Sequence, residues 1–289
     1  MPAFEMPPKS VLITGCSEGG IGAALAAEFR TRGCQVFATA RDPNKMQSLQ
    51  DLGMEIIALD VNSDSSITAA VSAVQKVTDG SLDYLINNAG VNHVMPFTDA
   101  KVDDFRRVIE TNVVAVLAVT HAFLPLLIRA KGTVAMLGSV NEIFCPPYQA
   151  AYNASKAAVH AMARTLRVEL APLGVKFVTL MTGSVRTKLF NNAPTKVPEH
   201  SLYRAVAENV ENREFLKEAR WIEPDVFARR VVDEVLKPRP KLNIWYGGMS
   251  TIAWILSWFG WEGMLVSFPL LVYFLYLRTK LIITGFHSH

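Results

Sequence analysis

Short apolar runs alternate along the chain with longer stretches of helical periodicity, and this alternation limits the fold more than any other feature. It is typical of βαβ units, in which each parallel strand is followed by a helix. Six runs are expected as strands: residues 10–14, 35–39, 55–59, 82–87, 133–137 and 176–181. Four stretches are expected as helices: residues 21–31, 65–78, 102–129 and 148–173. The sequence therefore predicts an α/β fold with a doubly wound parallel sheet, whose ligand site lies at the carboxyl ends of the strands.

The chain divides into a mixed body and an apolar C-terminal segment. At 289 residues it is long enough for one large domain with a full core. From residue 242 to residue 277 the only charged side chain is Glu262, so residues 248–289 are expected to form an apolar helical extension. Residues 191–220 carry more charges and turn residues than their neighbours, which predicts a loop or lid over the site.

Charge and cysteine content make two classes of protein poor candidates. The 29 Lys and Arg residues against 26 Asp and Glu residues give a formal charge of +3, far from the concentrated basic surface that nucleic acid requires. We expect no nucleic-acid partner. Cys16, Cys34 and Cys145 are odd in number and form no CxxC pair, so a reducing, cytosol-facing compartment fits best.

The stretch TGCSEGGIG, residues 14–22, directly follows the first predicted strand. In a βαβ unit this turn leads into the N-terminus of a helix, where free N–H groups and the helix dipole favour an anion. Glycine is needed there because a Cβ would hold a phosphate away from the backbone. A glycine turn without a ligand is the alternative. Five residues of the turn are expected to contact a dinucleotide: Gly15, Ser17, Gly20, Ile21 and Gly22.

The ends of the next three strands carry residues suited to the rest of a dinucleotide. Arg41, in QVFATARDPNK, offers a planar cation to the 2′-phosphate of NADP, whereas an acid at the strand end would bind the free 2′-hydroxyl of NAD. Asp42, one position further, leaves NAD open, and a solvated surface arginine is the alternative for Arg41. Further cofactor contacts are expected from Asp60, Val61, Asn88, Ala89 and Gly90. We expect no metal in the site.

The segment AAYNASKAAVHAM contains the clearest chemical signal. Tyr152 and Lys156 are four positions apart on a predicted helix, which places a phenol and an ammonium on one face. We expect the cation to lower the pKa of the phenol, so that Tyr152 donates a proton to a carbonyl oxygen while hydride reaches carbon. Ser139, at the end of the fifth strand, is placed to hydrogen-bond the same oxygen. The alternative is a tyrosine and a lysine on a solvated helix face.

Together these pieces resemble the short-chain dehydrogenase/reductase family over residues 8–247. The matching pieces are TGCSEGGIG, NNAG at 87–90, Asn112 in ETNVVAV, Ser139, and YNASK at 152–156. The resemblance implies a Rossmann fold, a homodimer or homotetramer, and a catalytic tetrad of Asn112, Ser139, Tyr152 and Lys156. It also implies that Lys156 holds the nicotinamide ribose and that Asn112 supports a water-linked proton relay. The segment TGSVRT resembles the nicotinamide-side motif of the family, which implies contacts from Val185 and Thr187.

Two departures from the family pattern stand out. The usual three residues between the first two glycines are four here, between Gly15 and Gly20, so the phosphate turn is lengthened around Glu18 or Gly19. The extra residue changes the spacing at Ser17 and Glu18 and leaves the turn itself in place. Thr182 stands where the family commonly has proline, which we expect to loosen the start of the substrate loop.

Within the family, the TGCS opening resembles fungal NADPH-dependent acyl-dihydroxyacetone-phosphate reductases and hydroxysteroid and retinol dehydrogenases, which implies a lipid-like carbonyl substrate. The apolar tail points the same way, because residues 250–277 are long enough to span a bilayer and carry interfacial Trp and Tyr. Glu262 in mid-span is costly. A single span, a shallow hairpin, and helices that cap the pocket and form a subunit contact therefore remain open.

The sequence predicts an NADP(H)-dependent oxidoreductase that interconverts a ketone and a secondary alcohol on an apolar, lipid-like substrate, with reduction as the expected direction. We expect it at a membrane, at the endoplasmic reticulum or a lipid droplet, with the catalytic domain facing the cytosol. The alternatives are a tailoring ketoreductase of polyketide, terpenoid or steroid metabolism, and a catalytically silent dinucleotide-binding membrane scaffold.

Overall fold

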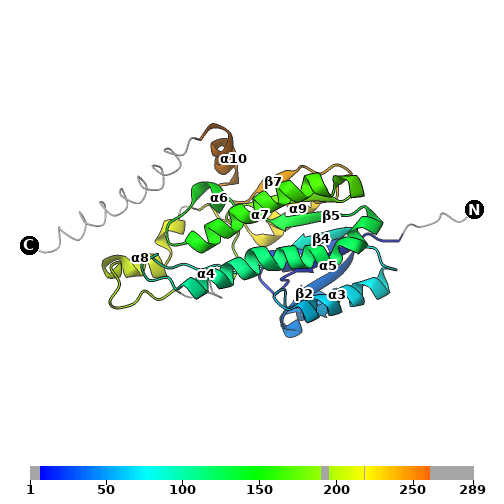
Figure 1. Ribbon diagram of the computed structural model, residues 1–289, viewed down its shortest axis with the longest axis horizontal. Coiled ribbons are helices and arrows are strands. Elements are labelled where there is room, and N and C mark those ends of the chain that lie inside the picture. Colours follow the sequence, from blue (N-terminus) through cyan, green and yellow to red (C-terminus); the bar gives the residue numbers. More distant parts are fainter. Residues whose placement is uncertain (1–6, 190–194, 218, 261–289) are drawn as a thin grey trace, which may run out of the picture.

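The computed structural model describes residues 7–189, 195–217 and 219–260 (Figure 1). Their centre is one seven-stranded sheet in the order β3-β2-β1-β4-β5-β6-β7, with every neighbouring pair parallel. The strands are β1 (Ser10–Thr14), β2 (Gln35–Ala40), β3 (Glu55–Ala58), β4 (Tyr84–Asn87), β5 (Thr133–Leu137), β6 (Lys176–Thr182) and β7 (Asn243–Tyr246). The order reverses direction between β1 and β4, so the sheet is doubly wound as predicted.

Helices cover both faces of the sheet. One face packs against α1 (Ile21–Thr31) and α9 (Pro224–Val235), around buried Leu25, Phe29 and Phe227. The other packs against α3 (Asp64–Val77), α5 (Ala115–Ala130) and α7 (Ala150–Glu169). The shorter elements are η1 (Pro43–Met46), α2 (Gln47–Asp51), α4 (Val102–Ile109), η2 (Glu110–Val114), α6 (Asn141–Phe144), η3 (Ala171–Leu173), η4 (Arg204–Val206), α8 (Ala207–Glu211), η5 (Glu214–Leu216) and α10 (Ser250–Phe259).

The helix expected over residues 102–129 is three consecutive elements. Two α-helical parts, α4 and α5, flank one turn of π-helix, η2, which contains Asn112. Among the described residues, Val102–Ala130 is the one helix long and apolar enough to cross a membrane. It lies against the sheet, and Val119 and Phe123 are buried in the core, so its apolar character is explained by the fold.

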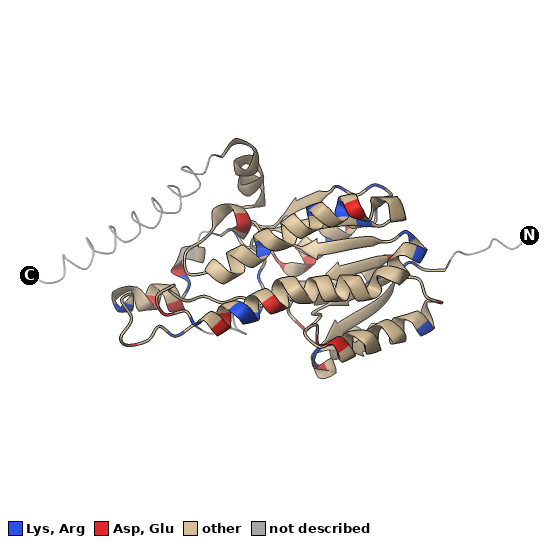
Figure 2. Ribbon diagram, viewed as in Figure 1, with Lys and Arg blue, Asp and Glu red and all other residues tan. Residues whose placement is uncertain are grey.

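The C-terminal segment is described only as far as Gly260, and the rest of the extension predicted for residues 248–289 lies outside the described residues. After β7 the chain forms α10, which lies beside α6 (Figure 1). Helix α10 contains no Lys, Arg, Asp or Glu (Figure 2). It buries Ser250 and Ala253, whereas Trp258 is 71% exposed and Phe259 is 76% exposed. Most apolar side chains of α10 therefore face away from the body.

Candidate functional site

The glycine turn between β1 and α1 has the conformation that a phosphate site requires. Gly15 and Gly19 both have φ of +76°, a left-handed conformation that favours glycine. The backbone N–H of Gly20 donates to the carbonyl of Ser17 at 3.2 Å, which closes the turn around Glu18 and Gly19. The extra residue is thus absorbed in a tight turn that leaves Gly20 as the N-cap of α1. No side chain caps this helix, so the first N–H groups of α1 remain available to an anion.

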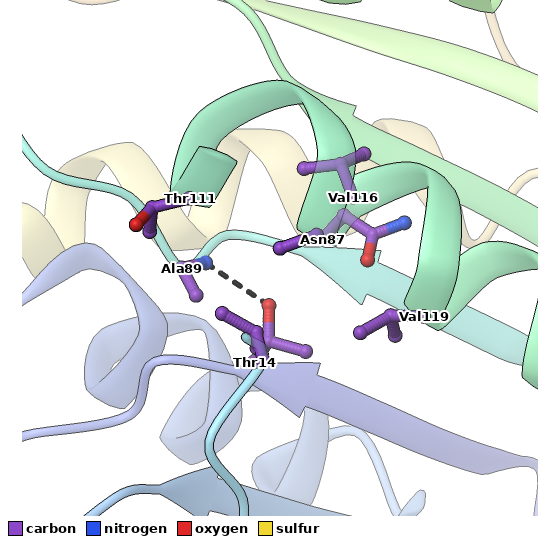
Figure 3. A pocket seen from close by; sticks show the side chains of 8 residues that line it. Thr14, Asn87, Ala89, Thr111, Val116 and Val119 are labelled. Atoms are coloured by element: carbon purple, nitrogen blue, oxygen red, sulfur yellow. Dashed lines mark hydrogen bonds between the residues drawn. The ribbon is translucent and has the colours of Figure 1, made fainter. Parts of the chain in front are cut away.

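The segment after β4 holds the glycine turn in place. The Asn88 amide donates to the carbonyl oxygens of Thr14 and Gly15, at 2.7 and 3.0 Å. The backbone nitrogens of Asn88 and Ala89 both donate to the Thr14 hydroxyl, the second of which is drawn in Figure 3. A Cβ on Gly22 would lie 2.4 Å from the Gly15 carbonyl oxygen and 2.5 Å from the Asn88 amide nitrogen. The Asn88 side chain thus supports the turn, and Gly22 is required for its close packing.

The end of β2 is joined to the glycine turn by backbone hydrogen bonds. The nitrogen of Cys16 donates to the Thr39 carbonyl at 2.8 Å, and that of Glu18 donates to the Lys45 carbonyl at 3.0 Å. Arg41 is exposed and has no ion pair among the described residues. The Asp42 carboxylate accepts from the nitrogen of Asn44 and caps η1. Asp42 is therefore engaged in a local turn, whereas Arg41 is exposed at the end of β2.

The ends of β3 and β4 form the next part of the site. Asp60 follows β3, and its carboxylate accepts from the nitrogen of Asn62 at 3.1 Å. Val61 and Ala89 line one small hollow together with Thr14 and side chains of α5, shown in Figure 3. Gly90 lies against Asn112, because a Cβ there would approach the Asn112 side-chain oxygen to 3.2 Å. The residues predicted here from three strand ends therefore meet at one edge of the sheet.

Ser139 and Tyr152 line a pocket of about 100 Å³ at the carboxyl ends of β5 and β6. Ser139 follows β5 and accepts a hydrogen bond from the nitrogen of Asn141 at 3.1 Å. Tyr152 lies in the first turn of α7 and is half-buried. Lys156, one turn later, is 4% exposed, and its ammonium donates to the Leu137 carbonyl at 2.7 Å. That ammonium lies 5.5 Å from the centre of the Tyr152 ring. The three predicted side chains are thus grouped.

The pKa shifts in this group differ from the sequence expectation. Burial raises the pKa of Tyr152 to about 12, and a hydrogen bond with Ser139 offsets part of the rise. Burial lowers the pKa of Lys156 to about 8. The pKa of Tyr152 thus shifts in the direction opposite to the expected lowering, because removal from water outweighs the hydrogen bond with Ser139. At neutral pH Tyr152 is a protonated phenol, the form that a proton donor needs.

The Asn112 side chain bonds to the segment after β4 and to α7. Its side-chain oxygen accepts from the nitrogen of Val91 at 2.8 Å, and its amide donates to the Val91 carbonyl at 2.9 Å. The same amide donates to the Ser155 hydroxyl at 3.0 Å. Ser155 in turn donates to the Tyr152 carbonyl. Asn112 thus connects the segment after β4 with α7, and its place in a π-helical turn matches the frequent use of such turns at functional sites.

The segment after β6 forms the remaining wall of the pocket. Val185 is buried and pairs with Ile222 in an isolated bridge, and the Thr187 hydroxyl accepts from the nitrogen of Leu189. Both line the pocket, as does Ile21 of α1. Thr182 is the buried end of β6 and pairs with Tyr246 of β7, and the loosening expected in the loop that follows stays a prediction.

Two buried polar residues of the pocket escaped the sequence interpretation. Gln149 and Asn92 both line the pocket, are both 1% exposed, and are joined by a hydrogen bond of 2.9 Å. Gln149 lies three positions before Tyr152, on the approach to the same helix, and this spacing was the available signal. Asn92 follows the NNAG segment by two positions, and nothing in its local sequence marks it.

The fold and the site define the class of the protein. A doubly wound parallel sheet with an anion-binding glycine turn binds a dinucleotide, and the protonated tyrosine beside a serine and a lysine is suited to proton transfer at a carbonyl oxygen. This combination is that of a dinucleotide-dependent oxidoreductase.

The sequence model of a family described as short chain dehydrogenase matches residues 9–198, and the chain belongs to this family of oxidoreductases. It is 41% identical over 255 residues to the short-chain dehydrogenase ptmH of Penicillium ochrochloron, covering 87% of this chain and 93% of that protein. It is 39% identical over 279 residues to the NADPH-dependent 1-acyldihydroxyacetone phosphate reductase of Schizosaccharomyces pombe, covering 91% and 94%. A solved short-chain dehydrogenase from Burkholderia cenocepacia, in complex with NADP, aligns with a TM-score of 0.66 at 26% identity, covering 86% of this chain and 93% of that one.

Proposed function

We propose that the chain reduces a ketone to a secondary alcohol on an apolar, lipid-like substrate, with NADPH as the reductant. The observation that carries this proposal is the pocket in which Ser139 and Tyr152 lie among apolar side chains. Its apolar lining includes Ile21, Leu137, Val140, Val185, Leu189, Leu216 and Trp221. Apolar walls around two hydroxyl groups suit a carbonyl carried on a hydrocarbon chain.

The cofactor is NADP(H), which supplies or accepts the hydride when bound. The glycine turn and the N-terminus of α1 would hold its diphosphate, and Arg41 its 2′-phosphate. Val185 and Thr187 would contact the nicotinamide side, and Lys156 the adjoining ribose. The fit is supported by the left-handed conformation of Gly15 and Gly19, which shapes the turn, and by the N-terminus of α1, which no side chain caps.

Tyr152 acts as the proton donor in the proposed reaction. Ser139 donates a hydrogen bond to the substrate oxygen, and Tyr152 passes its proton to that oxygen as the C=O bond becomes a C–O bond. Tyr152 is protonated at neutral pH, which is the form that a proton donor needs. The S. pombe relative is named as a reductase, which agrees with it.

The site of action is proposed to be a lipid surface, with residues 248–289 as the anchor and the catalytic domain in the cytosol, at the endoplasmic reticulum or a lipid droplet. Support comes from the exposed Trp254, Trp258 and Phe259 of the uncharged helix α10. None of the described residues of α10 lines the pocket, so a role as a pocket cap has no support from this part of the chain.

The active form is proposed to be a homodimer or homotetramer. Leu117 of α5 is 47% exposed and Val168 of α7 is 75% exposed, on the two long helices that cover one face of the sheet. Light scattering after gel filtration in detergent measures the mass of the protein in solution, which is compared with the 31.9 kDa of one chain. A single species at that mass would contradict the proposal.

The reaction is tested by assaying NADPH oxidation by the purified protein with a panel of ketones that runs from long-chain and glycerol-derived ketones to polyketide and steroid ketones. Tyr152→Phe should abolish turnover and leave NADPH affinity nearly unchanged, since only the acid is lost. Turnover by Tyr152→Phe above a few per cent of wild type would remove the assigned role. Activity confined to polyketides or steroids would favour a tailoring ketoreductase, and no activity with tight NADPH binding would favour a silent scaffold.

A further inference from the structure

Gln149 carries a buried hydrogen-bond donor that nothing in the described structure uses. The residue directly precedes α7 and lines the pocket that holds Ser139 and Tyr152. Its amide nitrogen Nε2 is buried and has no hydrogen-bond partner among the described residues. Native proteins leave few buried donors unpaired, because the lost hydrogen bond to water is not replaced. The proton-transfer role assigned to Ser139 and Tyr152 gives no account of this donor.

The orientation of the Gln149 amide is fixed by a short chain of hydrogen bonds. The backbone nitrogen of His93 donates to the side-chain oxygen of Asn92 at 2.7 Å, which identifies that atom as the oxygen. The Asn92 amide nitrogen then donates to the Gln149 side-chain oxygen at 2.9 Å. The Gln149 oxygen therefore faces Asn92, and its NH₂ group is left on the other side.

Other polar side chains of the pocket lining are already engaged. The Asn141 amide donates to Asn153, the Thr182 hydroxyl donates to the Leu180 carbonyl, and the Thr187 hydroxyl accepts from Leu189. The nitrogen of Gln149 is closed to water, so solvent does not satisfy it. A molecule bound in the pocket can supply the acceptor if a small movement of this wall brings one of its oxygens to the Gln149 nitrogen.

We propose that the Gln149 amide donates a hydrogen bond to a second oxygen of the substrate, one that lies within a few bonds of the carbonyl reduced at Tyr152. Gln149 and Tyr152 line the same pocket and are three positions apart at the start of α7, so a substrate whose carbonyl reaches Tyr152 places its adjoining atoms near Gln149. The preferred substrate class is an α-oxygenated ketone, with an ether or ester oxygen on the carbon next to the carbonyl. This inference rests on the proposed ketone reduction and narrows it.

The test compares two ketones that differ in one atom: 1-methoxydecan-2-one and dodecan-4-one, in which a CH₂ group replaces the ether oxygen. The measured quantity is the ratio of kcat/KM for the two ketones, with NADPH saturating. Gln149→Met keeps the length of the side chain and removes the donor, so this ratio should fall about tenfold relative to wild type. A general loss of folding or of catalysis would lower both values together and leave the ratio unchanged.

Gln149→Met also leaves the Asn92 amide without its partner. If that variant does not fold, the double variant Asn92→Leu/Gln149→Met removes both polar partners and serves in the same comparison. A ratio within twofold of wild type in the folded variant would overturn the role of Gln149 while ketone reduction stands. Wild type that oxidises NADPH with neither these two ketones nor any ketone of the panel would overturn the proposed function, and this inference with it.

Discussion

At the scale of single residues, Lys156 combines a burial cost with a role in the site. Its ammonium is 4% exposed, and burial lowers its pKa from 10.5 to about 8. Below pH 8 the lysine is charged in both the folded and the unfolded chain, so the folded state carries the full cost of burying the charge. Above pH 10.5 it is neutral in both states and the cost is gone. Between these values the unfolded chain binds more protons, and stability rises with pH.

Lys156→Met should therefore be inactive and more stable than wild type by roughly 2 kcal/mol at pH 7. This gain should shrink as the pH rises from about 8 to 10.5, because wild type recovers the same free energy. Urea denaturation of both proteins at several pH values measures the difference. A constant difference across this range would show that the charge of Lys156 is not the cause.

Arg41 is expected to select NADPH over NADH. Arg41→Asp removes the cation and adds a repelling charge, so the ratio of kcat/KM with NADPH to that with NADH should fall roughly 100-fold. Lys45→Asp is the matched control, because Lys45 is exposed in the adjoining η1 and makes the same change of charge nearby. A larger fall with Lys45→Asp than with Arg41→Asp would transfer the role to the lysine.

The residues of the site were largely predictable because each follows a strand or a turn with a distinctive local sequence. Ser139, Tyr152 and Lys156 meet as expected, and so do the glycine turn and the NNAG segment. The pKa of Tyr152 was not predictable, because it depends on how deeply the phenol is buried, and the sequence does not encode that locally. Gln149 was missed for the same reason, since its unpaired donor exists only in the folded chain.

At the scale of elements, the π-helical turn η2 between α4 and α5 sets the position of Asn112. Asn112→Ala removes the two hydrogen bonds to the Val91 backbone and the hydrogen bond to the Ser155 hydroxyl. This variant should therefore lower the free energy of unfolding by about 2 kcal/mol and lower kcat. Of these hydrogen bonds, Ser155→Ala removes only the one between Asn112 and Ser155. It should lower the free energy of unfolding by less than half as much. Thermal unfolding, together with measurement of kcat, distinguishes the two variants. Equal losses in the two variants would place the main contribution of Asn112 at Ser155.

Elements with a strong periodicity were predicted to within one or two residues, as for β1, β5 and α1. The break at η2 was missed, because the stretch from residue 102 to residue 129 has the continuous apolar pattern of one helix. Strand β7 was missed because NIWY is short and has no pattern that distinguishes it from the apolar segment that follows. The strand is formed because its backbone pairs with β6, and the local sequence does not show this pairing.

At the scale of the whole molecule, the relation of the C-terminal segment to the body is the main point to test. A chain ending at Gly248 should be folded and soluble and should still oxidise NADPH with a water-soluble ketone, because α10 buries only Ser250 and Ala253 and lines none of the pocket. The full-length protein should pellet with membranes, resist high salt and be released by detergent. A second chain ending at Phe259 shows whether α10 alone is enough for binding. Aggregation or inactivity of the Gly248 chain would make the segment part of the domain.

The backbone hydrogen bonds that join the glycine turn to the end of β2 have a consequence for how such proteins diverge. They run from Cys16 to Thr39 and from Glu18 to Lys45, and involve only main-chain atoms. Substitutions of the side chains at Cys16, Glu18 or Lys45 therefore leave these hydrogen bonds between the glycine turn and the segment that carries Arg41 in place. We thus expect the glycine turn and the segment after β2 to keep their relative position when these side chains change among relatives.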